Sequence, residues 1–172
     1  MAKKKYAKYV MEPKPPPGVW VPQHDGKVAN PFTFEKSTFA GSAIHCECHI
    51  HYAPGGSFGG GEELKTEPGV TAPTKVLMPH KHDVDEVFFF VGTNPQDTSD
   101  LGGEYEFWLG EGEEAEKYTF TKTTCIYVPK GLVHNPNIAR RVDRPFLMFA
   151  VLLASEHSCE YPACGLPPGF KR

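Results

Sequence analysis

Short apolar runs separated by turn-forming residues are the feature that most constrains the fold of this chain. The sequence contains 17 glycines and 17 prolines among 172 residues, well above average usage. Between these turn signals lie six runs with the length and composition of strands, at 75–78, 86–91, 104–109, 117–121, 125–128 and 145–153. We find no helical pattern of ten or more residues, so the sequence predicts an all-β sandwich or barrel.

Residues 39–52 alternate between two kinds of side chain, which is the pattern of a strand. One face carries Ile44, Cys46, Cys48, Ile50 and Tyr52, and the other carries His45, Glu47, His49 and His51. Because a charged row inside a small barrel is costly unless it is paired, we expect the apolar face to lie inside and the histidine face outside. If the histidine face points inward instead, His49 and His51 are candidates for acid–base catalysis or a second metal site.

The chain divides by composition into an arm, a barrel and a tail. Residues 1–30 are basic and then rich in proline, which favours an extended N-terminal arm. Residues 31–155 hold the strand-like runs, and residues 156–172 form an irregular C-terminal tail. Residues 53–73 predict a long loop, which is either a lid over a pocket or a dimer contact. The arm and the exposed sheet edges predict a homodimer in which the arm is exchanged.

The charge balance and the cysteine content restrict the partners and the compartment. With 18 Lys+Arg against 21 Asp+Glu, the net charge of −3 argues against nucleic-acid binding, which requires a basic surface.

The longest apolar run, 146–154, is far shorter than a membrane span, and no signal-peptide core follows the basic start. The five cysteines are an odd number, so we expect reduced thiols in a cytoplasmic protein, Cys159 and Cys164 included.

Three histidines and one glutamate are spaced so that they can meet at one metal ion. His80 and His82 are separated by one residue, so both imidazoles project to the same face of a strand. A short turn can bring Glu86, at the head of the next strand, to the same point. Further along the chain, a Pro-x-Gly turn at 129–131 can aim His134 at the same centre.

This ligand set indicates the kind of metal and the kind of substrate. Three imidazoles and one carboxylate suit a divalent transition metal, namely Mn, Fe, Ni, Co or Zn, better than Ca or Mg. An octahedral ion with four protein ligands keeps two open positions. These positions can bind a small-molecule substrate through two adjacent oxygens, or a substrate together with water or dioxygen.

These residues resemble the two sequence motifs of the cupin superfamily, over residues 74–150. The matching positions are His80, His82, Glu86 and Gly92 in the first half, and Pro129, Gly131, His134 and Asn137 in the second. The resemblance implies a double-stranded β-helix, a small barrel that holds its metal inside, with the three histidines and the glutamate as ligands. It does not fix the reaction, because cupins include decarboxylases, dioxygenases, isomerases, lyases, hydrolases and binding proteins without catalytic activity.

Five further side chains are candidates to line the site. Phe88 and Phe90 share the face of the carboxylate ligand in its strand, and we expect them to form an apolar wall of the substrate pocket. Glu106 and Trp108 share one face of a later strand, where Glu106 is a candidate general base and Trp108 a candidate pocket residue. A strand face with charged residues such as Glu106 more commonly lies on the outside of a barrel, in contact with solvent. Tyr127 precedes the Pro-x-Gly turn and is a candidate catalytic residue.

Three functions are compatible with this site. The first is a metal-dependent enzyme that acts on an oxo- or hydroxy-carboxylate, a diketone or an enediol, with the ion as a Lewis acid. It would be a decarboxylase or other lyase, an isomerase or a hydrolase. The second is an Fe(II)-dependent dioxygenase, which metal identity and oxygen consumption would distinguish. The third is a non-catalytic cupin that binds a metal or a small molecule, and the complete ligand set favours an enzyme over it.

Overall fold

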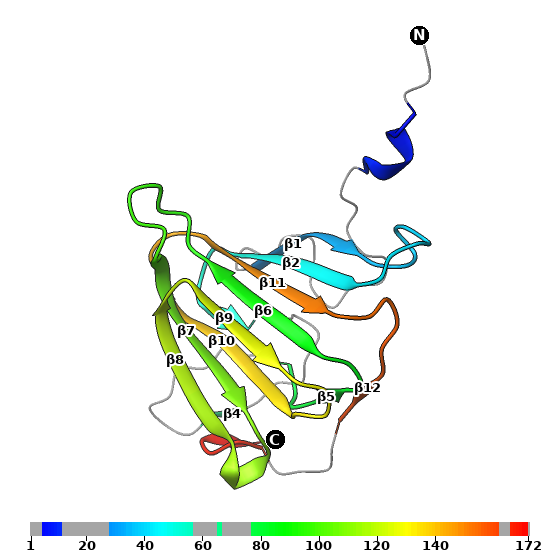
Figure 1. Cartoon of the computed structure of the whole chain (residues 1–172). Coiled ribbons are helices and arrows are strands. Elements are labelled where there is room, and N and C mark those ends of the chain that lie inside the picture. Colours follow the sequence, from blue (N-terminus) through cyan, green and yellow to red (C-terminus); the bar gives the residue numbers. More distant parts are fainter. Residues whose placement is uncertain (1–4, 12–27, 57–64, 67–76, 162–165, 172) are drawn as a thin grey trace.

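The chain folds into two antiparallel β-sheets that face each other in the computed structural model (Figure 1). The structure describes residues 5–11, 28–56, 65–66, 77–161 and 166–171. The five-stranded sheet has the strand order β1-β2-β11-β6-β9, and the four-stranded sheet has the order β3-β10-β7-β8. This non-sequential order means that the chain crosses repeatedly between the two sheets, as in a double-stranded β-helix.

The strands of the five-stranded sheet are β1 (Val28–Phe34), β2 (His45–His51), β11 (Phe146–Leu152), β6 (Glu86–Val91) and β9 (Thr124–Val128). The four-stranded sheet consists of β3 (Gly55–Gly56), β10 (His134–Val142), β7 (Asp100–Leu109) and β8 (Glu116–Lys122). Two short pairs join distant segments, β5 (Lys81–His82) with β12 (Cys159–Glu160) and β4 (Lys65–Thr66) with β13 (Phe170–Lys171). The helical segments, η1 (Ala7–Tyr9) and η2 (Gly112–Glu114), are single 3-10 turns.

This architecture confirms the all-β prediction, and β6 has the bounds that the sequence predicted. The alternating segment at 39–52 is shorter as a strand than expected, because β2 begins at His45. Residues 75 and 76 of the predicted strand 75–78 lie outside the described residues, and the rest of that run forms no strand. Neither helical turn of the described chain approaches the length and apolarity that a membrane-crossing helix requires.

The arm, the long loop and the tail each contribute at least part of a strand. β1 begins at Val28, within the predicted arm, and pairs with β2. Most of the predicted loop at 53–73 lies outside the described residues, and its described parts include β3 and β4. In the tail, β12 and β13 pair with β5 and β4. Through β12, the tail is attached to the barrel beside the predicted metal ligand His82.

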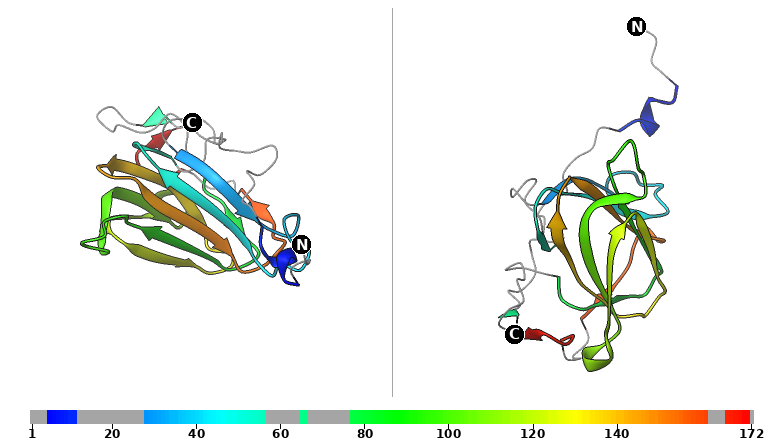
Figure 2. Two further views of the ribbon diagram at one scale, coloured as in Figure 1. Left: turned by 90° about the horizontal axis from the view of Figure 1, so that it is seen from above. Right: turned by 90° about the vertical axis from the view of Figure 1, so that its left-hand side faces the viewer.

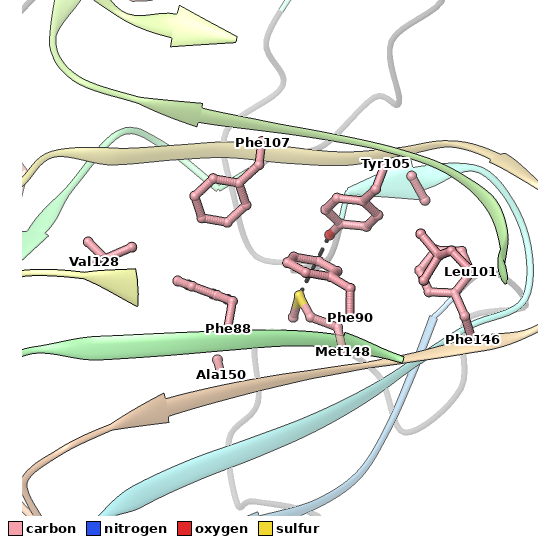
Figure 3. Close-up of a cluster of buried hydrophobic side chains, with 10 residues drawn as sticks. Phe88, Phe90, Leu101, Tyr105, Phe107, Val128, Phe146, Met148 and Ala150 are labelled. Carbon is pink, nitrogen blue, oxygen red and sulfur yellow. Dashed lines mark hydrogen bonds between the residues drawn. The ribbon is translucent and has the colours of Figure 1, made fainter. Parts of the chain in front are cut away.

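The space between the two sheets is filled mainly by aromatic side chains (Figure 3). β6 and β11 alternate between buried and more exposed residues, so Phe88, Phe90 and Met148 point inward. Tyr105 of β7 meets them from the opposite sheet, with its ring centroid 4.5 Å from that of Phe90. The Tyr105 hydroxyl donates a hydrogen bond to Asn137 Oδ1 at 3.0 Å, which satisfies the polar end of a fully buried side chain.

Candidate metal centre

Three buried histidines from two segments of the chain converge at one point. His82 belongs to β5, His80 directly precedes this strand, and His134 opens β10. The backbones of His80 and His134 pair as a β-bridge, with N···O distances of 3.1 and 2.9 Å in the two directions. One ring nitrogen of each histidine lies within 4.8 Å of those of the other two. This group is the candidate metal centre.

A tight turn brings His134 to this point, as the Pro-x-Gly pattern predicted. The Leu132 N–H donates to the Pro129 carbonyl at 3.0 Å, and Gly131 has a φ of +81°, in the left-handed region that favours glycine. The Gly131 N–H donates to the carbonyl of His82 at 2.9 Å. The turn is therefore tied to the segment that carries the other two histidines.

The backbone orients all three imidazoles in the same way. Nδ1 of His80 lies 2.9 Å from the carbonyl oxygen of Met78, Nδ1 of His82 lies 2.9 Å from that of Ser158, and Nδ1 of His134 lies 3.2 Å from that of Leu132. A carbonyl oxygen only accepts, so each Nδ1 donates its proton, and in a neutral imidazole Nε2 then keeps its lone pair. Metal-binding histidines are held in this way, by an outer hydrogen bond that leaves the inner nitrogen free.

Glu86 supplies a buried carboxylate to the same point. Its Oε2 lies 3.0 Å from Nε2 of His134 and 3.6 Å from Nε2 of His82. Within the described residues, Glu86 Oε2 and His134 Nε2 are buried atoms without a hydrogen-bond partner. Such atoms are costly in a protein interior, and a cation between them would satisfy both. The four residues predicted as ligands therefore fit a metal ion.

The surroundings of the centre keep one of its imidazoles neutral and place two aromatic rings beside it. Burial, followed by the neighbouring His134 ring, lowers the pKa of His80 to about 3, so this imidazole is neutral at physiological pH as a metal ligand must be. The rings of Phe88 and Phe107 lie 5.9 and 6.5 Å from that of His134. Phe88 thus borders the centre, while its role as a wall of a substrate pocket stays a prediction. Phe90, two residues further along β6, packs deeper in the aromatic core.

The histidine face of β2 points into the barrel, contrary to the expectation from the sequence. His49 and His51 are fully buried, and the His51 ring stacks on that of Phe146 at a centroid distance of 5.0 Å. The apolar face of β2 is turned outward instead. The polar row can lie inside because its charged member, Glu47, is paired.

Glu47 is a carboxylate held between two histidines. Its two oxygens lie 3.1 Å from Nε2 of His45 and 3.1 Å from Nε2 of His49. Burial alone would raise the pKa of Glu47, but the hydrogen bonds from the two histidines outweigh it and bring the pKa to about 2. Burial opposes the charged form of His45, yet Glu47 and then Glu35 raise its pKa. β2 therefore places an ionised carboxylate and two candidate proton carriers inside the barrel.

Glu106 and Trp108 lie on the outer face of the four-stranded sheet, so neither lines the centre. The neighbouring Phe107 occupies the inner face, and strand alternation turns Glu106 and Trp108 away from it. Arg140 Nε lies 2.8 Å from Glu106 Oε2, and Trp108 Nε1 donates to Glu106 Oε1 at 2.7 Å. Both residues are nevertheless buried, because Phe170 packs on Trp108 at a centroid distance of 5.8 Å. Glu106 is part of a structural ion pair rather than a general base.

Tyr127 also lies away from the centre, although the sequence made it a candidate catalytic residue. It pairs with Val87 across β9 and β6 and is exposed on the outer face of the five-stranded sheet. The next residue, Val128, takes the inward position and is buried. The turn that follows therefore delivers His134 inward while leaving Tyr127 outside.

The C-terminal segment around β12 borders the centre, although the sequence pattern did not place it in the site. The ring of His157 lies 5.1 Å from that of His82, and the ring of Tyr161 lies 5.6 Å from that of His80. Cys159 is directly opposite His82 in the β12–β5 pair, so the two side chains share a face. The alternate placing of an imidazole, a thiol and a phenol in this segment was the signal that could have identified it.

The fold and the centre together define a class of protein. Two facing antiparallel sheets that bury three histidines and a glutamate between them are the arrangement that the cupin resemblance implied. The chain therefore has a cupin-like fold, and its histidine cluster can hold a metal ion.

Comparisons with known proteins give likenesses of fold alone. No family model matches the chain, and no curated protein matches it. Among solved structures it is similar to oxalate oxidase in complex with the substrate analogue glycolate, with 12% identity, a TM-score of 0.48, and coverage of 80% of this chain and 56% of that one. It is also similar to a Lactobacillus farciminis oxalate decarboxylase formate complex, with 14% identity, a TM-score of 0.46, and coverage of 78% of this chain and 30% of that one. A third similar structure is vicilin from Corylus avellana (hazelnut), with 12% identity, a TM-score of 0.42, and coverage of 72% of this chain and 28% of that one. The chain spans about half of the first protein and less than a third of the others.

Proposed function

We propose that this protein is a metal-dependent enzyme of the cupin type that acts on a small oxygenated substrate. The observation that carries the proposal is the set of three imidazoles whose Nδ1 atoms are held by carbonyls and whose ring nitrogens meet at one point. A histidine cluster with a purely structural role does not need free Nε2 lone pairs beside a buried carboxylate.

His80, His82, His134 and Glu86 would hold one divalent ion of Mn, Fe, Ni, Co or Zn, which supplies Lewis-acid chemistry when bound. Neutral imidazoles and a single carboxylate leave a net positive charge at such a centre. This charge favours substrates with two adjacent oxygens, such as an oxo- or hydroxy-carboxylate, a diketone or an enediol. The corresponding reactions are decarboxylation or another elimination, isomerisation and hydrolysis.

The residues around the centre are placed to exclude water and to carry protons. The ring of Phe88 covers one side of His134, which keeps the centre in apolar surroundings. The half-buried ring of His157 lies 5.1 Å from those of His82 and His45, and so connects the centre to the His45–Glu47 pair. An imidazole in this position can take up or release a proton at a ring nitrogen.

The first experiment is metal analysis by plasma mass spectrometry on protein purified anaerobically without added metal. We expect close to one equivalent in the wild type and roughly a tenth of it or less in His80→Ala and His134→Ala. Tyr118→Phe, on the exposed strand β8, is the control and should keep the metal. A wild-type protein that contains no metal and acquires none on reconstitution would contradict the proposal.

The second experiment offers oxo-carboxylates, hydroxy-carboxylates, dicarboxylates and diketones to the metal-loaded protein, under nitrogen and under air. Turnover under nitrogen supports the proposed Lewis-acid chemistry. Turnover that requires oxygen, with iron as the metal, would identify a dioxygenase instead. Binding with no chemical change under any metal would identify a binding protein.

We also propose that the protein is a homodimer, that its arm, barrel and tail divide near residues 30 and 155, and that it is cytoplasmic. The cysteine content and the strand pattern support these proposals.

A further inference from the structure

The turn that joins β5 to β6 carries two aspartates, Asp83 and Asp85, between two of the predicted metal ligands. Asp83 is exposed and Asp85 is half-buried, as is usual for acidic residues in a turn. Each of them nevertheless binds the backbone of a distant segment. Asp83 Oδ1 accepts a hydrogen bond from the Ser158 N–H at 2.7 Å, and Asp85 Oδ1 accepts one from the Lys130 N–H at 2.8 Å. Both of these segments contribute to the metal centre.

The hydrogen bond to Asp83 acts on the orientation of His82. The residue that donates it, Ser158, places its own carbonyl oxygen 2.9 Å from Nδ1 of His82. Ser158 directly precedes β12, the short orange strand that lies against β5 at one end of the barrel (Figures 1 and 2). A pairing of two residues is a weak attachment for a chain segment. Asp83 therefore helps to fix the carbonyl that orients the His82 ring.

The hydrogen bond to Asp85 acts on the placement of His134. Lys130 is the middle residue of the Pro-x-Gly turn at 129–131, which leads to His134 three residues later. Asp85 directly precedes Glu86, so its bond ties this turn to the start of β6. The two ligands that the tie brings together are in contact, with Glu86 Oε2 3.0 Å from Nε2 of His134. Asp85 therefore holds the segment of one ligand against the segment of the other.

An aspartate elsewhere in the chain makes the same kind of bond without any connection to the centre. Asp97 Oδ1 accepts the Ser99 N–H at 2.9 Å in the loop between β6 and β7, at the far end of β6 from the centre. Its partner is two residues away, so this bond shapes only its own loop. Asp83 and Asp85 instead bind N–H groups that are 75 and 45 residues away. Local turn formation does not account for such contacts, whereas the assembly of distant ligands does.

We propose that Asp83 and Asp85 are positioning residues of the metal centre, Asp83 for His82 and Asp85 for His134. Neither aspartate binds the ion, and each holds a backbone segment that fixes the place of a ligand. Hydrogen bonds outside the ligand set orient the ligands and raise the affinity for the metal. This role rests on the proposed function, because it requires that the three histidines and Glu86 bind an ion.

Titration of the metal-free protein with Co²⁺ alone, followed by visible absorption, tests this role without a substrate. We expect Asp83→Ala and Asp85→Ala each to bind Co²⁺ about tenfold more weakly than the wild type, because a ligand loses its fixed position. Asp83→Asn and Asp85→Asn should stay within about threefold of the wild type, since asparagine keeps an oxygen acceptor and removes only the charge. Asp97→Ala is the matched control and should bind Co²⁺ like the wild type.

Two further measurements separate positioning from a general loss of stability. The visible spectrum of bound Co²⁺ reports the arrangement of its ligands, so it should change in the two alanine variants and keep its wild-type form in the asparagine variants. Urea unfolding of the metal-free proteins should give similar midpoints for Asp83→Ala, Asp85→Ala and Asp97→Ala, since each loses one exposed or half-buried hydrogen bond.

Three outcomes would overturn the positioning role while leaving the metal centre in place. These are alanine variants that bind Co²⁺ as tightly as the wild type, a loss of affinity that Asp97→Ala shares, and asparagine variants as weak as the alanine ones. The last result would mean that the negative charges attract the ion directly. A wild type that binds no Co²⁺ would overturn the proposed function and this role with it, so the two failures are distinguishable.

Discussion

The two ends of the barrel interior are built from the same strands but have opposite chemistry. β6 begins with Glu86 at the metal centre and continues inward with Phe88 and Phe90. β2 likewise begins with the half-buried His45 near the centre and ends with His51 stacked on the aromatic core. The inner face of one sheet thus carries both the site and most of the packing, divided along the length of each strand. Substitutions at the aromatic end should therefore change the stability of the fold without changing the metal affinity.

The largest loss of stability should come from the aromatic end. Phe90 is fully buried against Phe88, Tyr105 and Phe120. We expect Phe90→Ala to lower the free energy of unfolding by about 3–5 kcal/mol, because the surrounding rings cannot fully close the cavity. Urea unfolding in the presence of a chelator measures the loss. Metal titration of the folded variant should still give the wild-type affinity, and an affinity that fell with the stability would break the separation of the two ends.

At the polar end, the stability contributed by Glu47 should depend on pH. The folded pKa of about 2 lies below the ordinary value of 4.5, so the ionised carboxylate stabilises the fold above pH 4.5. That contribution is lost as the pH falls from 4.5 through 2. Glu47→Gln should therefore lower the free energy of unfolding by about 2–3 kcal/mol at pH 7 and remove this pH dependence.

Urea unfolding of the metal-free protein at several pH values checks this expectation. The gap between the wild type and Glu47→Gln should be full at pH 7 and smaller at pH 3. Glu113→Gln, in the exposed turn η2, is the control and should leave the pH dependence unchanged. A gap of the same size at both pH values would mean that His45 and His49 do not hold Glu47 ionised.

A smaller effect is expected from a polar contact inside the aromatic core, which joins β7 to β10. The Tyr105 hydroxyl donates to Asn137 Oδ1 at 3.0 Å, and both side chains are buried. Tyr105→Phe should cost about 1–2 kcal/mol, because the buried Asn137 oxygen loses its donor while the ring packing stays. Thermal unfolding measures the change, with metal affinity expected to remain at the wild-type value. An unchanged melting temperature would show that the hydrogen bond adds nothing to the core.

The strand pattern and the ligand spacing could be read from the sequence because both depend on local geometry. The one-residue separation of His80 and His82, and the turn at Pro129 and Gly131, act over a few residues and a strand period of two. The orientation of β2 could not be read in the same way. Alternation separates its two faces, but which face lies inside depends on the pairing of Glu47 and on what covers the outer face.

The remaining differences between the sequence-based predictions and the structure come from contacts between segments that are far apart in the chain. Glu106 and Trp108 looked like solvated or pocket residues, and only the approach of Arg140 and Phe170 shows them as buried on the outer face. His157 reaches the centre because β12 pairs with β5, and a pairing of two residues leaves almost no pattern in the sequence. Such tertiary contacts override local preference.

The smallest effect is expected from Tyr127, which the sequence placed in the site and the structure places on the outer face. Its hydroxyl interacts with Asp85, which raises the pKa of Tyr127, and the side chain is exposed. Tyr127→Phe should therefore leave the metal affinity, the urea midpoint and the pH dependence of any turnover at their wild-type values. A tenfold or greater loss of turnover in Tyr127→Phe, with the metal retained, would mean that the phenol reaches the substrate. The barrel would then have to open near β9, and the separation between the inner site and the outer face of the sheet would fail there first.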